Sequence, residues 1–267
     1  MQVYKNKLVS VLITVFNEEK YIVQSLTSLI NQSYHHWEAI IIDDSSSDNT
    51  INIIKKKFKD RRVKLFKLKK HIGRRRAINY GIKKCKGSYV SILDADDLYL
   101  KNKLQEQINY LNKNTDIKLL ATWAHLIDED SSIVGSFKAP IELEKIKKKL
   151  LIKNIVCFSS VIFDKSFVMK NNFFPLKLSY AIDYELTLKI LKSSKLYILP
   201  KFLCKSRIRK MGLTHNKKNQ IINFKDNLIL MKYVKENFYL NFTNKFFWLN
   251  QKFIIYFRIL LIKLNLI

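Results

Sequence analysis

Three aspartates stand close together in the segment SYVSILDADDL (88–98): Asp94, Asp96 and Asp97. They follow an apolar, β-forming run, so a strand would deliver them to the turn at its carboxyl end. An Asp-x-Asp turn supplies the oxygen ligands that Mg²⁺ and Mn²⁺ prefer, with water and substrate phosphates completing the coordination shell. The same residues also suit a helix cap. Their position among the other elements must therefore decide between a metal site and a cap.

Two further strand-like runs end in polar residues. The run LVSVLITVF leads to Asn17 and Glu18, and the run EAIIID leads to Asp43 and Asp44. The carboxyl ends of parallel strands meet at one edge of a sheet, where open α/β proteins bind ligands. Capping accounts for one Asp or Ser per helix, and DDSSSDNT does resemble capping material. It does not account for paired carboxylates at two strand ends, so we favour a binding site.

The alternation of strand and helix patterns predicts the fold class. Over the first hundred residues, apolar positions at helical spacing separate the strand-like runs, which is typical of βαβ units. The run 8–16 is continuously apolar and β-branched, as in a strand buried on both faces. We predict an α/β, Rossmann-like, mostly parallel sheet flanked by helices, with a helical C-terminal extension. The expected strands are 8–16, 38–43, 63–68, 88–93, 117–123 and 159–164, and a helix is expected over 181–192.

These segments resemble, in their order and spacing, the family 2 glycosyltransferases with a GT-A fold. The resemblance rests on VSVLITVFNEEKYIVQSLTSLINQSYHHWEAIIIDDSSSDNT, then HIGRRRAINYGIKKCKGSYVSILDADD, then AIDYEL. It covers about residues 7–100 closely and continues more loosely to about residue 215. It implies a catalytic domain over 1–215, a nucleotide-sugar donor, Mn²⁺ or Mg²⁺ as cofactor, and transfer with inversion at the anomeric carbon. Residues 216–267 would form a basic, amphipathic helical extension.

The resemblance assigns donor-binding roles to residues at the first two strand ends. Thr14, Phe16 and Glu18 would line the nucleoside pocket, although Thr14 stands where the family usually has proline. One residue of the acidic pair, Asp43 or Asp44, would bond the uracil edge.

Further roles are implied at the end of the expected strand 88–93. Asp94 would lie near the ribose and Asp96 would hold the metal, while Asp97 is expected to cap the next helix. Arg74 starts the GRRRAIN helix and would reach the diphosphate, since helix N-termini and arginines both favour phosphate. The family often has arginine where this chain has Ile78.

Asp183 in AIDYEL matches the family's catalytic aspartate, with Ile182 in place of the usual glutamate. It would act as the general base on the acceptor hydroxyl, while the metal at Asp96 stabilises the departing nucleoside diphosphate. The helix pattern alone favours a cap, or a solvent-facing partner of Lys189 or Lys192. The order of the motifs favours the base.

The segment SRIRKMGLT resembles the family's late Tyr-Arg-x-His motif, with Arg209 in place of the histidine. Arg207 and Arg209 would close over the diphosphate once the donor binds. The alternative is a pair of surface arginines on a strand. His35, His36 and His71 show no ligand spacing, and we assign them no role; His215 is expected to be a loop residue and not a ligand.

The chain has 49 Lys and Arg residues against 22 Asp and Glu, a formal net charge of +27. Such a charge indicates an anionic partner, although a lysine-rich composition also enlarges the solvated surface. Residues 55–76 hold 13 Lys and Arg, but Phe58 and Phe66, the only candidate aromatic platforms for nucleic acid among them, suit helix and strand cores instead. We therefore expect no nucleic-acid partner and favour an anionic membrane surface.

The tail 244–267 supports a membrane partner. Its aromatic and aliphatic residues are interrupted by Lys252, Arg258 and Lys263, so it suits a membrane interface better than a span. A helix docked on the catalytic domain or on a partner subunit is the alternative. We expect a cytoplasmic protein, peripheral on the inner face of the membrane, acting on a glycan or lipid-linked glycan. Three widely spaced cysteines without C-x-x-C spacing agree with a reducing compartment.

Two other classes stay open from the residues alone. A nucleotidyltransferase would also use carboxylates and a metal on an α/β sheet, but it leaves Asp183 without a role. A non-catalytic membrane-binding or nucleic-acid-binding module is supported by the net charge only. The favoured hypothesis is an inverting, metal-dependent glycosyltransferase. It would move a sugar from a UDP-linked donor to a hydroxyl of a growing bacterial surface glycan such as a capsule or lipopolysaccharide.

Overall fold

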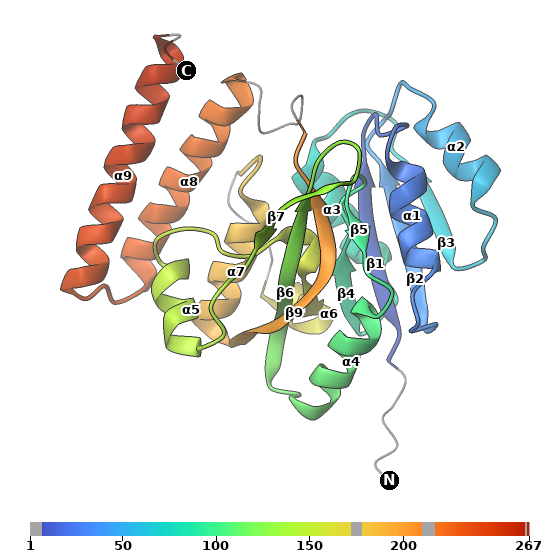
Figure 1. Ribbon diagram of the computed structural model, residues 1–267, viewed down its shortest axis with the longest axis horizontal. Helices are drawn as coiled ribbons and strands as arrows, with labels where there is room; N and C mark the ends of the chain where they lie inside the picture. The colour runs from blue at the N-terminus through green and yellow to red at the C-terminus, as the bar shows by residue number, and fades with distance from the viewer. Residues whose placement is uncertain (1–6, 172–177, 210–216, 265, 267) are drawn as a thin grey trace.

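The computed structural model describes residues 7–171, 178–209, 217–264 and 266 (Figure 1). Its described strands form one sheet in the order β3-β2-β1-β4-β8-β6-β9-β5, with β7 paired to β6 outside this path. Helices cover both faces, as expected for an α/β fold (Figure 1). The predicted fold class is therefore confirmed.

The first half of the sheet is parallel. β1 pairs in parallel with β2 and β4, and β2 pairs in parallel with β3. Each crossover is a helix, so the predicted βαβ units are present, and the carboxyl ends of the strands lie at one edge. The bounds are β1 Val9–Val15, α1 Ile22–Ile30, β2 Trp37–Asp43, α2 Thr50–Lys57, β3 Val63–Lys67, α3 Arg74–Lys84 and β4 Tyr89–Ile92.

Strand β1 is buried on both faces, which explains its unbroken apolar sequence. Leu12 joins the hydrophobic core on the α3 side of the sheet, whereas Val11 and Ile13 join the core on the α1 side. Helix α3 lies very close to the sheet at Gly81, where a Cβ would stand 2.3 Å from Leu12 Cδ1 and 2.9 Å from Ile42 Cγ1. The glycine therefore fixes the distance at which α3, and Arg74 at its start, lies from the sheet.

The second half of the sheet is mixed. β8 is antiparallel to β4 and β6, while β9 runs parallel to β6 and antiparallel to β5. The strand expected at 117–123 extends to residue 127, and a 3₁₀ turn over 158–160 precedes β8. The remaining bounds are β5 Leu98–Tyr99, α4 Lys103–Lys113, β6 Ile117–Ile127, β7 Ile133–Phe137, α5 Leu143–Leu150, β8 Ile162–Asp164, α6 Lys165–Lys170, α7 Ile182–Ser193 and β9 Lys195–Arg207.

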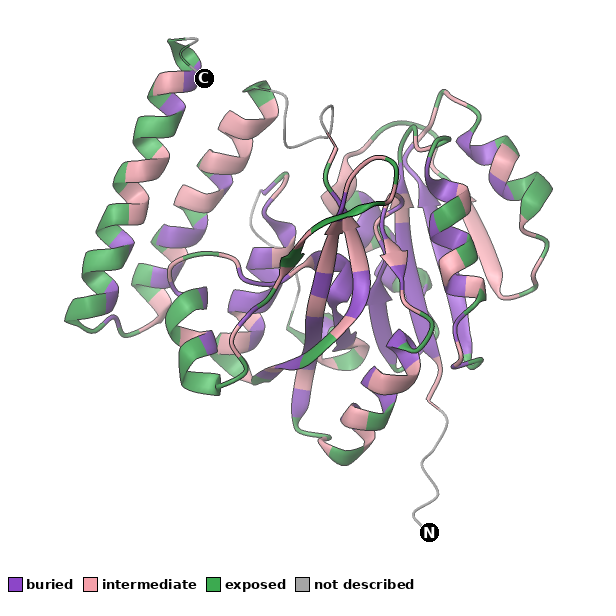
Figure 2. Ribbon diagram, in the orientation of Figure 1, coloured by how far each residue is buried: buried purple, intermediate pink, exposed green. Residues whose placement is uncertain are grey.

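Two long helices, α8 (Lys217–Asn237) and α9 (Phe242–Lys263), lie side by side at one end of the molecule, with α8 next to α7 (Figure 1). Leu230 and Val234 of α8 are fully buried in the same core as α7. Trp248 of α9 donates from Nε1 to the Met231 carbonyl at 3.2 Å. The predicted helical extension is present, and it shares its hydrophobic core with the preceding residues. Most of the outer surface of α9 is exposed (Figure 2).

Candidate active site

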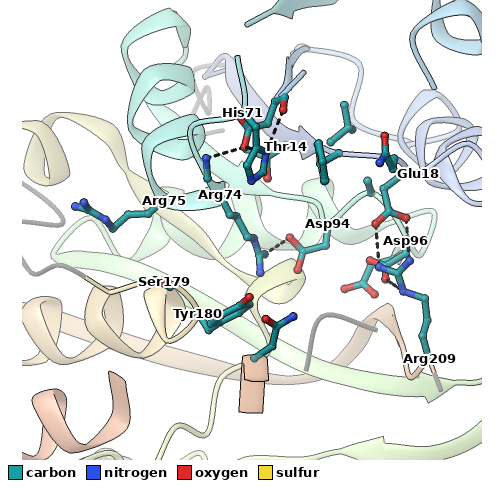
Figure 3. Close-up of a pocket in the computed structure, with 18 of the residues that line it drawn as sticks. Thr14, Glu18, His71, Arg74, Arg75, Asp94, Asp96, Ser179, Tyr180 and Arg209 are labelled. Carbon is teal, nitrogen blue, oxygen red and sulfur yellow. Dashed lines mark hydrogen bonds and ion pairs between the residues drawn. The ribbon is translucent and has the colours of Figure 1, made fainter. Parts of the chain in front are cut away.

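A pocket of about 1060 Å³ opens at the carboxyl ends of β1 and β4. This volume suits a ligand of nucleotide-sugar size. Side chains that lie far apart in the sequence converge on it, among them Glu18, Arg74, Asp94, Asp96 and Arg209 (Figure 3). The rest of its wall comes from the ends of β1 and β2, the loop before α3 and its first turn, the segment before α7, the end of β9 and one residue of α8. These wall residues include Thr14, Phe16, Asp44, His71, Arg75, Ser179, Tyr180, Arg207 and Asn219.

The turns that leave β1 and β2 are tight. Asn17 and Ser45 have φ values of 57° and 69°, in the left-handed region that costs an L-residue about 1–2 kcal/mol. Asn17 offsets part of this cost because its Oδ1 accepts the Ser47 N–H at 2.9 Å. These turns send the chain from each strand end directly into the loops around the pocket.

The acidic pair at the end of β2 is split between two tasks. Asp43 is fully buried, and its carboxylate accepts the Ser46 N–H within the turn. Asp44 lines the pocket, where it accepts the Ile72 N–H at 2.7 Å and the Gly73 N–H at 2.9 Å. Of the two, Asp44 is therefore the residue that lies where a ligand could meet it.

His71 lies at the pocket although it was assigned no role from the sequence. Its Nδ1 is 3.0 Å from Asp44 Oδ2, and its ring centroid is 4.3 Å from that of Phe16, with the planes tilted by 41°. Thr14 also lines this part of the wall. The phenyl and imidazole rings offer a flat ligand an aromatic surface. The signal for His71 was its place two residues before Gly73, which directly precedes α3 and has a positive φ of 87°.

Arg74 and Asp94 form an ion pair across the pocket (Figure 3). Arg74 stands at the first position of α3, and its guanidinium also lies 5.3 Å from the Phe158 ring centroid. Asp94 is held by its backbone, because its N–H donates to Ser159 Oγ at 3.0 Å. A cationic side chain and a helix N-terminus together favour an anionic ligand such as phosphate.

Asp96, Glu18 and Arg209 form a second charged group. Arg209 donates from Nε to Asp96 Oδ2 at 2.7 Å and from its two terminal nitrogens to Glu18 at 2.9 and 3.1 Å. Burial, reinforced by the negative charge of Asp96, raises the pKa of Glu18 to about 7 despite the pairing with Arg209. Burial likewise raises the pKa of Asp96. Two carboxylates thus share one cationic group.

The carboxylates of Asp96 and Glu18 are suited to bind a divalent metal. A cation already lies between Asp96 and Glu18, in the form of the Arg209 guanidinium, so the carboxylates are arranged to hold positive charge. Within the described part of the chain, no three His, Cys, Asp or Glu side chains converge as a complete ligand set. Mg²⁺ and Mn²⁺ often take only one or two carboxylates together with substrate phosphates. Asp96, with Glu18 beside it, therefore fits such a metal.

Asp97 and Arg207 have their polar groups engaged by the protein. Asp97 was expected to cap the next helix, but Asn102 precedes α4, and the Asp97 carboxylate instead accepts the Arg207 N–H at 2.7 Å. The expectation of a cap was wrong because a strand-end turn and β5 intervene before α4. Arg207 is 8% exposed, and its guanidinium donates to the carbonyls of Asp96, Asp128 and Glu129 and to the side chains of Gln24 and Ser131.

Asp183 lies in the first turn of α7, three residues after the pocket residue Tyr180, and it is not itself one of the residues that line the pocket. Its carboxylate accepts the Asn154 side-chain N–H at 2.7 Å and the Tyr184 N–H at 2.8 Å. Burial raises its pKa to about 6, and it lies close enough to Arg74 and Asp94 for their charges to affect that pKa. The alternative partners do not occupy it: Lys189 pairs with Glu185, and Lys192 bonds Asn237. Asn154 was not found from the sequence, since it stands alone in a lysine-rich stretch.

Comparison with known proteins is consistent with this geometry. The profile described as glycosyl transferase family 2 matches residues 10–170. An uncharacterized glycosyltransferase of Methanocaldococcus jannaschii is 31% identical over 250 residues, which cover 92% of this chain and 81% of the relative. The Escherichia coli UDP-Glc:alpha-D-GlcNAc-diphosphoundecaprenol beta-1,3-glucosyltransferase WfgD is 34% identical over 215 residues, which cover 79% of this chain and 81% of WfgD.

Solved structures share the fold. Staphylococcus aureus TarS, residues 1–349, superposes with a TM-score of 0.69 at 22% identity, covering 92% of this chain and 71% of that one. The Pyrobaculum calidifontis mannosyltransferase PcManGT, in complex with GDP-Man and Mn²⁺, superposes with a TM-score of 0.63 at 15% identity, covering 91% and 72%. The matched profile and the relatives of similar length lead to one conclusion: this chain belongs to glycosyl transferase family 2.

Proposed function

We propose that this protein is an inverting, metal-dependent glycosyltransferase that moves a sugar from a UDP-linked donor to a hydroxyl of a growing bacterial surface glycan. The observation that carries the proposal is the position of Asp183. This half-buried aspartate, with a pKa raised to about 6, lies in the first turn of α7 near the Arg74–Asp94 pair, while Asp96 lies at the same strand end as Asp94. A base and a leaving-group site next to each other are what a single in-line displacement needs.

The nucleoside would bind at the ends of β1 and β2. The Phe16 and His71 rings offer a surface for the base, and Asp44 lies beside them with its carboxylate held by the Ile72 and Gly73 N–H groups. The Asp43 carboxylate accepts the Ser46 N–H of its own turn, so we assign it the task of shaping the loop. Thr14 and Glu18 complete the wall, and the ribose would lie near Asp94.

The diphosphate would lie between Arg74 and the Asp96 group. Mn²⁺ or Mg²⁺, held by Asp96 with Glu18 beside it, would supply positive charge to the departing diphosphate. Arg209 would release these carboxylates to the metal and would then pair with the diphosphate, the role expected for it from the sequence. Arg207 has its donors bound to the protein, so we assign it the task of holding the loop 128–131 against Asp96.

Asp183 would act as the general base. The acceptor oxygen forms a bond to C1 of the sugar while the bond from C1 to the diphosphate oxygen breaks, and the electron pair leaves with the nucleoside diphosphate. The hydroxyl proton moves to the Asp183 carboxylate. With a pKa of about 6 the carboxylate is mainly ionised at neutral pH, and its basicity is higher than that of an exposed aspartate. The Asn154 amide holds one carboxylate oxygen in place.

The acceptor is proposed from a relative. WfgD, by its name, acts on a diphosphoundecaprenol-linked sugar. A lipid-linked acceptor would bring this protein to a membrane surface, and we propose a cytoplasmic protein attached to the inner face of the cytoplasmic membrane, with no nucleic-acid partner. None of the described helices is long and apolar enough to cross a membrane. We propose that the attachment is peripheral.

Helix α9 supports that proposal. It exposes a row of large apolar residues, among them Phe246, Phe253 and Phe257 at 63%, 69% and 51%. Lys245 and Arg258 flank this row in the sequence, and the helix has no acidic residue along its length. Apolar and basic side chains on one exposed helix suit an anionic bilayer interface. A second copy of the chain would bring like charges together, so a lipid surface is the better partner.

Vesicle flotation tests the attachment. The Phe253→Ser, Phe257→Ser double variant should lose binding to vesicles that contain phosphatidylglycerol, whereas Ile133→Ser, Val134→Ser, which removes two exposed apolar residues of β7, should retain it. If both double variants bind as the unchanged protein does, α9 is not the attachment surface.

A donor screen tests the catalytic proposal. The protein should bind one nucleotide from a panel of UDP, GDP and dTDP in the presence of Mn²⁺, with UDP expected, and should slowly hydrolyse the matching nucleotide sugar. Asp96→Asn should abolish the metal-dependent part of nucleotide binding. Absence of any nucleotide binding with Mn²⁺ present, together with salt-dependent binding of oligonucleotides, would contradict the proposal.

A further inference from the structure

The C-terminal helix α8 carries a buried carboxylate at a position where an apolar residue is expected. Asp226 is 4% exposed and shares a helix face with Leu230, Met231 and Val234, which pack into the core. A charge at such a position is costly unless it is bonded. The hydrogen-bond partners of the Asp226 carboxylate therefore indicate its role.

Asp226 binds the segment that leads into α7. Its Oδ2 accepts three consecutive backbone N–H groups, from Ser179 at 2.8 Å, Tyr180 at 2.7 Å and Ala181 at 3.3 Å. Successive N–H groups that converge on one point form a concave site for a negative charge. The segment is thus fixed by a side chain from a helix about 45 residues further along the chain.

The same segment forms part of the pocket. Ser179 and Tyr180 line it, and Asp183 follows two residues after Ala181 in the first turn of α7. Helix α8 also contributes Asn219 to the pocket lining. The C-terminal helix is therefore connected to the pocket at two points, one in its wall and one beneath the segment that carries the proposed base.

We propose that Asp226 is a positioning residue for the transfer reaction. Its carboxylate fixes the backbone of residues 179–181, and this backbone sets the start of α7 and the place of the Asp183 carboxylate relative to the sugar's C1. Helix α8 is then a part of the active site, not a separable attachment. This inference deepens the proposed function and, for its kinetic consequence, rests on it.

Asp226→Asn is the test, because the amide has nearly the shape of the carboxylate but lacks its charge. We expect kcat for donor hydrolysis or transfer to fall about 10- to 100-fold, since small misplacement of a catalytic group has effects of this size. The Kd for UDP with Mn²⁺ should change less than 3-fold, because the nucleoside side of the pocket is built from β1 and β2. Glu236→Gln removes an exposed acid from the same helix and should leave both values unchanged.

A measurement on the unchanged protein keeps the inference testable if the variant folds poorly. The amides of 179, 180 and 181 should exchange with deuterium far more slowly than free amides, and Asp226→Asn should release them selectively. Free exchange in the unchanged protein, or full kcat in a folded Asp226→Asn, would overturn the inference. If no nucleotide sugar reacts with the unchanged protein while these amides are protected, the proposed function fails and the anchoring by Asp226 stands.

Discussion

Lys103 offers a quantitative test of the packing beneath the site. This lysine at the start of α4 is fully buried, and its Nζ donates to Ser91 Oγ and Gln107 Oε1, both at 2.9 Å. Ser91 belongs to β4, the strand that ends at Asp94. Within the described part of the chain no carboxylate pairs with this ammonium group, and burial lowers its pKa from 10.5 to about 7.

The sign of the effect on stability follows from this lowered pKa. Between about pH 7 and 10.5 the unfolded chain binds more protons than the folded one, so stability rises with pH in this window. The whole shift corresponds to about 5 kcal/mol, of which about 3 kcal/mol falls between pH 6 and 9. The penalty for burying the charge is fully present below about pH 7.

Urea unfolding of the unchanged protein and of Lys103→Met measures this penalty. The free energy of unfolding of the unchanged protein, relative to Lys103→Met, should rise by about 3 kcal/mol from pH 6 to pH 9, because the variant lacks the titrating group. Lys101→Met, which removes an exposed lysine two residues earlier, should show no such trend. A difference that stays flat for Lys103→Met would refute the reasoning, since it would mean that the lysine titrates alike in both states.

Three further predictions concern the position of α3 and the pocket charges. Gly81→Ala should lower the free energy of unfolding, measured by urea titration, by about 1–3 kcal/mol, because its Cβ would overlap Leu12 and Ile42. The control Gly135→Ala should change it by less than about 0.5 kcal/mol, and equal effects of the two substitutions would contradict the close packing at Gly81. Arg209→Met should lower the Kd for Mn²⁺ several-fold, measured by calorimetry without nucleotide, because the guanidinium that pairs with Asp96 is removed. A higher Kd would contradict competition between Arg209 and the metal for this carboxylate. The rate should fall on the acid side of about pH 6 as Asp183 takes up its proton, and a rate that stays constant to pH 4.5 would contradict its role as base.

The strand ends could be predicted because their signals are local. A continuous apolar run followed by paired acids identifies both the strand and the turn, and the pocket does form around Glu18, Asp44, Asp94 and Asp96. The order of the motifs then led to Asp183, whose helix pattern alone suggested a cap. Such signals need only a few neighbouring residues.

What the sequence could not reveal depends on contacts between distant segments. Arg207 was expected at the diphosphate, but its partners come from residues 24, 96 and 128–131, and no local pattern announces them. Asp97 looked like a cap because the next helix is near in sequence, whereas its partner lies on β9. Asp226 had a signal of its own, a charge in the apolar stripe of α8, yet its partners on 179–181 required the fold.

The central claim is that Asp183 removes the acceptor proton and does not bind the donor. The most direct measurement compares Asp183→Asn with the unchanged protein in two assays, nucleotide binding with Mn²⁺ and single-turnover reaction of the bound donor. The claim predicts a Kd within about 3-fold and a rate lower by about 10²–10⁴-fold. Asp116→Asn, which changes an exposed aspartate, should affect neither value. Loss of binding in parallel with loss of rate, or an unchanged rate, would contradict the claim.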